Sequence, residues 1–316
     1  MAEYTIRPIK GTVHGVLDAS IEPVLRIHSG DILHIETLEA DWRDKRPAPG
    51  ISEESYFPYR DPVRDVGHAL CGPFYVEEVR PGDALRIEIL DIETDDWGWS
   101  SVGIGNRDHL DRLGFEGSPF FRVWDIRHGI CEDQSGVTVP VDAFPGVLAV
   151  APKGDAPVRT HIPGPHGGNL DCRELRPGTT VYLPVSHPGA LFSVGDGHAA
   201  QGDGESGCTA IECPFKKISL RLSQAEYLSD YPVAVTATHL IAFGFDEDLT
   251  NAAYLALKNL RELMTKRFNM DEKLAMTVCS VSADLHITQI VNGIRGVHAM
   301  LPLSAWDMLA DRFCRR

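Results

Sequence analysis

Basic residues are scarce in this sequence: 30 Lys and Arg stand against 45 Asp and Glu, which gives a formal net charge of −15 at pH 7. A surface with this charge repels a phosphate backbone, so nucleic acid is excluded as a partner. Long apolar runs are missing as well, because none approaches the roughly 20 residues that a membrane-spanning helix needs. The N-terminal residues contain no basic region followed by an apolar stretch. We therefore expect a soluble, cytoplasmic protein without a membrane partner.

Cysteine pairs are a further absence. The seven cysteines are odd in number, widely scattered and never spaced as CxxC, which argues against a disulfide framework and against a thiolate zinc cage. Free, mostly buried thiols are expected instead. Four catalytic signatures are also missing: the GxxxxGK[ST] phosphate loop, GxGxxG after a strand, the GxSxG elbow and the HExxH helix. Their absence disfavours kinases, nicotinamide-dependent dehydrogenases, elbow-type serine hydrolases and zincins.

The composition and the turn pattern favour a folded, mainly β protein. The 316 residues are 43% hydrophobic and 24% charged, so a large core can form. Gly, Pro and Asp recur about every ten residues through the first two thirds of the chain. In residues 29–36 and 81–88 a Gly turn leads into a run in which apolar and polar residues alternate, as in a half-buried strand. We predict an antiparallel β-sandwich or barrel core over residues 1–235.

The pattern changes after residue 245. Apolar residues then follow a 3.6-residue spacing behind an acidic stretch, which predicts an amphipathic helix, and Asp271 is expected to cap a second one. The expected elements are a helix over 249–268, a second helix over 273–284, strands over 285–291 and 297–301, and a last helix over 306–312. We assign residues 236–316 to an α/β C-terminal portion that completes the fold.

Potential metal ligands and glycines are concentrated between residues 159 and 212. One Gly-rich stretch reads HGGNLD from His166, and another reads GDGHAAQGDGE from Gly195, after a β-like run. If that strand continues, Asp196 and His198 lie on one face about 6.6 Å apart along the chain, near enough to converge on one ion. Glycine lets backbone approach an ion or a substrate where a Cβ would clash. The two stretches together indicate a ligand site.

These stretches belong to a set of six motifs that occur in order along nearly the whole chain. The set is GPFYVEEVRPGD from Gly72, FPGVLAVAP from Phe144, PHGGNLD from Pro165, LFSVGDGHAAQGDGE from Leu191, GFDEDL from Gly244 and ADLHITQIVNGIRGVHAMLP from Ala283. In this set the sequence resembles the acetamidase/formamidase family. The resemblance implies a mainly β, oligomeric, metal-dependent hydrolase, typically a zinc enzyme, that releases ammonia from small aliphatic amides such as formamide and acetamide.

The resemblance also implies roles for particular residues. The family's metal-binding motif corresponds here to Asp171, Asp196 and His198 as ligands of one zinc ion, with Glu205 as the carboxylate that handles protons. One imidazole with carboxylates suits a catalytic zinc that keeps an open position. The residues expected to orient substrate, or to support the loop, are His166, Gln201 and Asp203. A structural Ca²⁺ in addition to the zinc is left open, as is the identity of the amide.

Two departures from the family pattern are Cys71, where relatives commonly carry Thr, and Cys172, beside Asp171. Neither belongs to the motif, so a Cys nucleophile is disfavoured. His68 is expected to be an ordinary packed or surface residue.

Two other classes of protein stay open. A cupin-like metal oxygenase would use His187, His198 and Glu205, although the HxH pair of such a site is missing. A non-catalytic ligand-binding β-sandwich would use the Gly-rich stretches as turns. Metal analysis separates the three readings, because zinc favours the hydrolase, iron or manganese the oxygenase, and no metal the binding protein.

Overall fold

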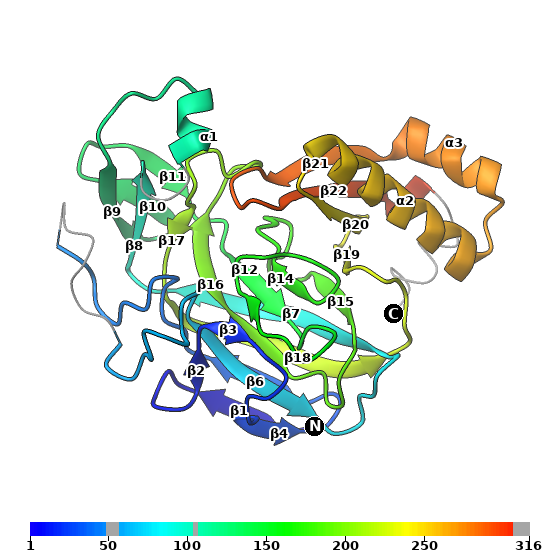
Figure 1. Ribbon diagram of the computed structural model, residues 1–316, viewed down its shortest axis with the longest axis horizontal. Coiled ribbons are helices and arrows are strands. Elements are labelled where there is room, and N and C mark those ends of the chain that lie inside the picture. The colour runs from blue at the N-terminus through cyan, green and yellow to red at the C-terminus, as the bar shows by residue number, and fades with distance from the viewer. Residues whose placement is uncertain (49–56, 104–106, 306–316) are drawn as a thin grey trace.

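The structure is a computed structural model that describes residues 1–48, 57–103 and 107–305. Two large β-sheets occupy most of the molecule, and two long helices lie at one end, above the C-terminal strands (Figure 1). The paired strands of the described chain are antiparallel except for β1 with β5 and β4 with β6. The predicted mainly β fold with C-terminal helices is therefore confirmed.

The first sheet has nine strands and runs through the whole chain. In spatial order they are β1 (Glu3–Ile6), β5 (Ile32–Ile35), β18 (Phe215–Ala225), β7 (Ala84–Thr94), β15 (Thr180–Pro184), β19 (Val233–Val235), β20 (His239–Asp246), β22 (Arg295–Pro302) and β21 (Asp284–Gln289). The alternation predicted for residues 29–36 and 81–88 is present, since Leu33, Leu85 and Ile87 are completely buried. Their apolar face makes one side of the main core.

The second sheet supplies the other side of that core and carries the Gly-rich stretches. Its path is β11 (Thr138–Pro140), β10 (Ile130–Asp133), β9 (Phe120–Arg127), β8 (Trp97–Val102), β17 (Ile211–Glu212), β16 (Phe192–Ala200), β12 (Phe144–Ala149) and β14 (Gly167–Asn169), while β6 (Leu70–Val76) pairs with β16, β2 (Val13–His14) and β4 (Leu25–Ile27). A small two-stranded sheet joins β3 (Val16–Leu17) to β13 (Val158–Arg159). Phe74, Phe192 and Val194 from the second sheet pack against the first.

Helices occur at two places in the described chain. The short α1 (Arg107–Arg112) follows β8, whereas α2 (Leu249–Phe268) and α3 (Glu272–Ser282) lie near the C-terminus, followed by a 3₁₀ turn at Leu303–Ala305. Asp248 caps α2 by accepting from the backbone N–H of Asn251, and Asp271 caps α3 as predicted. Gly244 on β20 allows α2 to pack closely, because a Cβ there would collide with the carbonyl of Ala252. The last predicted helix, over 306–312, lies outside the described residues.

The C-terminal elements continue the first sheet. Strand β19 ends at Val235 and pairs with β20, so the predicted boundary after residue 235 falls between two neighbouring strands of one sheet. A second core cluster lies between α2 and the strands β20 and β22, and it also takes in Tyr182 of β15. The division into a β-rich core over residues 1–235 and an α/β portion over residues 236–316 stays a prediction.

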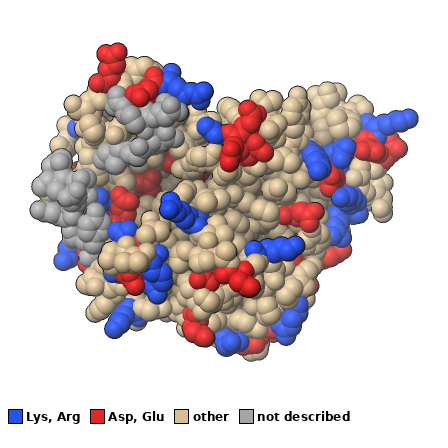
Figure 2. Space-filling view, viewed as in Figure 1, with Lys and Arg blue, Asp and Glu red and all other residues tan. Residues whose placement is uncertain are grey.

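The surface charge is mixed on the face shown in Figure 2. Lys and Arg are interspersed there with Asp and Glu, so the net negative charge is not gathered into one patch on the described part of this face. No helix in the described ranges is both long enough and apolar enough to cross a membrane.

His14 makes the stability of the fold sensitive to acid. Its buried ring bonds to the carbonyl of Val16 at 2.7 Å and to Ser193 Oγ at 2.9 Å, and burial lowers its pKa to about 4. The unfolded chain takes up this proton near pH 6.5, so we expect stability to fall between pH 6.5 and 4, by about 3 kcal/mol from this group. Denaturant unfolding at several pH values should show a shallower decline for His14→Gln. His128→Asn, a change at an exposed histidine with positive φ that Asn tolerates, is the control. An unchanged decline in His14→Gln would contradict the assignment.

Candidate active site

Strand β16 places two of the predicted ligands at the centre of the second sheet. All nine of its residues are buried, and it lies between β12, β6 and β17. The glycines on either side of Asp196 allow this crowding, because a Cβ on Gly195 would collide with the carbonyl of Ala69 and one on Gly197 with that of Cys213. The GDGH motif is therefore a buried strand whose glycines admit the neighbouring backbones.

Asp171 reaches the same place from the segment after β14. Single ligand atoms of Asp171, Asp196 and His198 lie within 4.8 Å of one another, and all three residues are buried. Asp171 Oδ2 accepts hydrogen bonds from the side-chain amides of Asn169 and Asn292, whereas its buried Oδ1 has no hydrogen-bond partner in the described structure. One carboxylate oxygen is therefore held, and the other is available to a ligand.

Gly146 on β12 keeps the space among these three side chains open. The β12–β16 register joins Pro145 to Gly197 and then Val147 to Gly195, so Gly146 lies opposite Asp196. A Cβ on Gly146 would collide with Asp196 Oδ2 and would lie 2.8 Å from His198 Cε1 and 3.0 Å from Asp171 Oδ1. The ligand atoms thus surround a position that only glycine leaves empty.

Two further buried carboxyl groups adjoin the cluster. Glu212 Oε2 lies 3.3 Å from His198 Nε2, and Asp196 Oδ1 lies 3.5 Å from the same nitrogen. Glu205 is also buried, with Oε2 lacking a hydrogen-bond partner within the described chain. The sequence marked Glu205 through its motif, but Glu212 lies at the end of the ligand-dense segment with no motif around it.

The cluster contains more buried carboxyl groups than positively charged groups to balance them. Burial, together with the neighbouring acidic groups, raises the pKa of Asp171 and of Glu205 well above the usual range. Burial alone would also raise the pKa of Asp196, but the charges of His68 and His198 bring it below its usual value. Burial would lower the pKa of His198, and Glu212 and Asp196 instead raise it. A divalent cation would compensate this charge, so the donor set fits one.

His68 is nearer to the cluster than its sequence context indicated. Its Nδ1 lies 3.9 Å from Asp196 Oδ2, and the same nitrogen lies 3.3 Å from Thr160 Oγ1. The sequence indicated an ordinary packed or surface residue and could not show this proximity, because it depends on the pairing of β6 with β16. His68 lies two residues before the first residue of β6, and the pairing of β6 with β16 brings it to Asp196.

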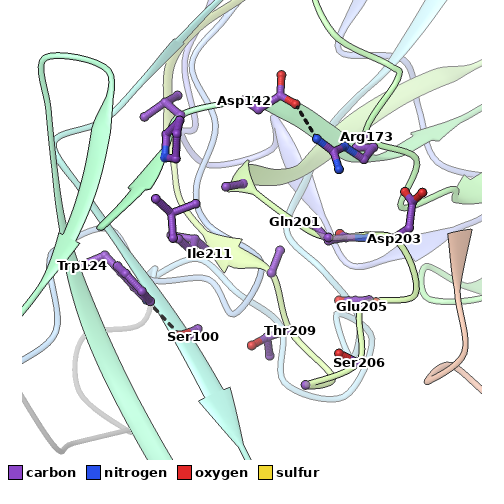
Figure 3. Close-up of a pocket in the computed structure, with 17 residues that line it drawn as sticks. Ser100, Trp124, Asp142, Arg173, Gln201, Asp203, Glu205, Ser206, Thr209 and Ile211 are labelled. Atoms are coloured by element: carbon purple, nitrogen blue, oxygen red, sulfur yellow. Dashed lines mark hydrogen bonds and ion pairs between the residues drawn. The ribbon is translucent and has the colours of Figure 1, made fainter. Parts of the chain in front are cut away.

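A cavity of about 700 Å³ opens beside the cluster (Figure 3). Glu205, Gln201 and Asp203 line it together with the apolar side chains of Trp124 and Ile211. Figure 3 shows Arg173, joined to Asp142 by an ion pair of 3.3 Å, on the same side as Gln201 and Asp203, with Trp124 across from them. A cavity of this size with polar groups on one wall suits a small organic ligand.

The remaining predicted residues occupy different positions. Gln201 Nε2 donates to the carbonyl of Asp171 at 3.0 Å, and Asp203 Oδ2 lies 2.9 Å from His286 Nδ1. His166 is half-buried, and its ring lies within its own loop, close to Gly164 and Gly168. The structure therefore brings Gln201 to Asp171 and Asp203 to the cavity, while His166 stays within its own loop.

The cupin-like arrangement is not assembled. His187 Nε2 bonds to the carbonyl of Pro152 at 2.7 Å, and no described interaction joins it to His198 or Glu205. Fold and site together define a mainly β protein with a buried carboxylate and imidazole cluster in the wall of an open cavity.

Comparison with known proteins assigns this class to a family. The model of the Acetamidase/Formamidase family matches residues 7–157 and 153–308, so the chain belongs to that family. The solved acetamidase of Bacillus halodurans is similar, with a TM-score of 0.86 and 31% identity over 97% of this chain and 99% of that one.

Two curated relatives are similar over part of their length. A Schizosaccharomyces pombe protein provisionally named a formamidase is 33% identical over 249 residues, 59% of this chain and 58% of its own. The formamidase of Methylophilus methylotrophus is 27% identical over 259 residues, 64% of this chain and 61% of its own. The matched region thus spans about three fifths of these relatives.

Gly146→Ala tests the geometry of the cluster. The added methyl group must displace Asp196 or His198, and overpacking of this kind costs about 1–3 kcal/mol, so affinity for zinc should fall about ten- to hundredfold. Isothermal titration with zinc measures the change. Gly202→Ala is the matched control, because a Cβ there meets nothing within 4 Å. Equal zinc affinity in the two variants would contradict the proposed ligand geometry.

Proposed function

We propose that the protein is a zinc-dependent amidohydrolase that cleaves small aliphatic amides, such as formamide and acetamide, to the carboxylate and ammonia. The observation that carries the proposal is the buried cluster of Asp171, Asp196 and His198, with an unpartnered carboxylate oxygen and an open cavity beside it. The names of the family and of its relatives support the same reaction class.

In this proposal Asp171, Asp196 and His198 hold one zinc ion. The donor set of one imidazole and two carboxylates leaves a position open for water or substrate, as catalytic zinc sites require. Zinc supplies Lewis acidity, which polarises a carbonyl oxygen and eases the deprotonation of water. Glu212 beside His198 Nε2 and the two amides on Asp171 orient the ligand side chains.

Glu205 is proposed to move the proton. It lines the cavity, and burial near Asp171 raises its pKa well above that of an ordinary glutamate. A carboxyl group with a raised pKa can accept a proton from the attacking water and pass it to the departing nitrogen. The second transfer matters because ammonia leaves readily only when the nitrogen is protonated.

The neighbouring residues are proposed to shape the pocket. Gln201 and Asp203 line the cavity and would orient the amide, and the bond from Gln201 to the Asp171 carbonyl also fixes the loop. His166 would support the Gly-rich loop in which its contacts lie.

We also propose a cytoplasmic homo-oligomer. Strand β21 is an edge of the first sheet, and apolar side chains are exposed on it and on α3: Leu274, Met276, Val281, Leu285 and Ile287. An exposed apolar area of this kind is typical of an interface between chains. Light scattering should give a mass of at least two chains of 34.8 kDa each, and the mass of one chain would contradict the oligomer.

Metal removal tests the reaction. After chelation, ammonia release from formamide, acetamide and propionamide should stop, and zinc should restore it, because the ligand cluster has no other source of Lewis acidity. Metal content is measured by mass spectrometry alongside activity, and circular dichroism verifies that the apo-protein is folded. Full activity in folded, verified metal-free protein would sink the proposal.

Two substitutions separate ligand from proton carrier. His198→Ala should lose both zinc and activity, because it removes a ligand. Glu205→Gln keeps the shape of the side chain and should keep zinc, while turnover falls roughly 10²–10⁴-fold. Glu132→Gln, an exposed change on β10, is the control. An active Glu205→Gln enzyme would remove Glu205 from the reaction, and a zinc-free one would make Glu205 a ligand.

A further inference from the structure

A second group of metal-ligating side chains lies outside the site described above. Single ligand atoms of Cys172, Glu174 and His298 lie within 4.8 Å of one another. The first two residues precede β15, and His298 lies on β22, so the group joins segments far apart in sequence. Cys172 and His298 are completely buried, and the Glu174 side chain is 15% exposed.

The contacts within this group leave a nitrogen without a hydrogen-bond partner. His298 Nδ1 bonds to Thr288 Oγ1 at 3.0 Å, whereas the buried Nε2 makes no hydrogen bond in the described structure, although Glu174 Oε2 lies 3.3 Å away. The same carboxylate oxygen lies 3.3 Å from Cys172 Sγ. In the tautomer in which Nδ1–H donates to Thr288, Nε2 directs a lone pair at the other two donors. This is how an accompanying hydrogen bond prepares a histidine for a metal ion.

The chemistry of the three donors selects the kind of ion. A thiol sulfur, an imidazole nitrogen and a single carboxylate suit zinc and related borderline ions in tetrahedral geometry. Calcium and magnesium require more oxygen ligands than this group offers. The group is therefore a poor candidate for the structural Ca²⁺ that the sequence left open.

The group borders a cavity other than the one at the candidate active site. Glu174 lines a separate cavity of about 300 Å³, whose wall also includes Thr179, His239 and Met300. Arg173, between the two ligands on the chain, instead lines the larger cavity beside Glu205. The consecutive residues Arg173 and Glu174 therefore line two different cavities.

We propose that Cys172, Glu174 and His298 form a second divalent metal site, suited to zinc, which ties the segment after β14 to strand β22. The segment carries Asp171 and Arg173, so the tether holds one ligand of the first cluster and one wall residue of its cavity. His298 also stacks on His286 at a ring separation of 5.2 Å, and His286 pairs with Asp203. The second site is thereby packed against the loop that borders the cavity.

The test uses the full chain produced in cobalt-supplemented medium. Thiolate bound to cobalt(II) gives a sulfur-to-metal charge-transfer band in the near ultraviolet, which the oxygen and nitrogen donors of the first cluster do not give. We expect this band together with cobalt in both sites. Folded, cobalt-loaded protein that lacks this charge-transfer band would overturn the proposal.

Variants assign the band to the site. Cys172→Ser should abolish it, and the buried helix residue Cys279, changed to Ser, is the matched control that should retain it. Asp196→Asn should weaken the first cluster and leave the band, so failure of the amidase proposal can be told apart from failure of this one.

A second variant tests the proposal if Cys172→Ser does not fold. Glu174→Gln keeps the side-chain size and should speed the loss of the thiolate-bound cobalt to a chelator roughly tenfold or more. A band that persists in folded Cys172→Ser, or an unchanged loss of cobalt in Glu174→Gln, would contradict the assignment.

Discussion

Burial of negative charge is the constraint on which the candidate site depends. Asp171, Asp196, Glu205 and Glu212 are buried together near the imidazole of His198. An ionised carboxylate in an apolar interior is strongly disfavoured unless it is paired, hydrogen-bonded or bound to a metal. Asn169 and Asn292 donate hydrogen bonds to Asp171, and His198 Nε2 lies close to the carboxylates of Asp196 and Glu212. The carboxylate oxygens that remain without a partner would be satisfied by a bound cation.

The backbone is strained at the same residues. Asp171, Asp196 and Glu205 have φ angles of 47°, 59° and 47°, in the left-handed region that residues with a Cβ seldom adopt. Such a conformation costs roughly 1–3 kcal/mol at each residue and persists only where the surroundings over-determine it. Strand β16 is held by neighbours on both sides, which gives this over-determination for Asp196. The strain coincides with the acidic cluster, as expected where a site is held in one geometry.

Local sequence patterns predicted the helices and the ligands that share a motif. The other residues of the site are brought together by strand pairing, which the sequence alone does not show. Helix α2 and the cap at Asp271 follow from spacing and charge along a short segment, so both could be predicted from the sequence, whereas the cap at Asp248 was not singled out. Asp196 and His198 were readable because they share one motif. Glu212 and Gly146 were not singled out, because only the pairing of β16 with β17 and with β12 brings them to His198 and Asp196. His166, although inside a motif, immediately precedes β14, where Gly167 and Gly168 adopt positive φ.

The C-terminal hairpin connects the last described strands to the candidate site. Gln289 Oε1 accepts from the backbone N–H of Val291 and of Asn292, and its Nε2 donates to the carbonyl of Ile294, so one side chain shapes the turn between β21 and β22. That turn extends toward the loop after β16 (Figure 1), where Gly204 bridges to Gln289.

The shaped turn presents Asn292 to Asp171 Oδ2, at 3.1 Å. With Asn169 on the same oxygen, rotation of the carboxylate is restricted, and Oδ1 is the atom left for a ligand. The final motif of the sequence therefore acts on the site through hydrogen bonds 121 residues apart along the chain. The C-terminal portion thus fixes which oxygen of Asp171 faces the cluster.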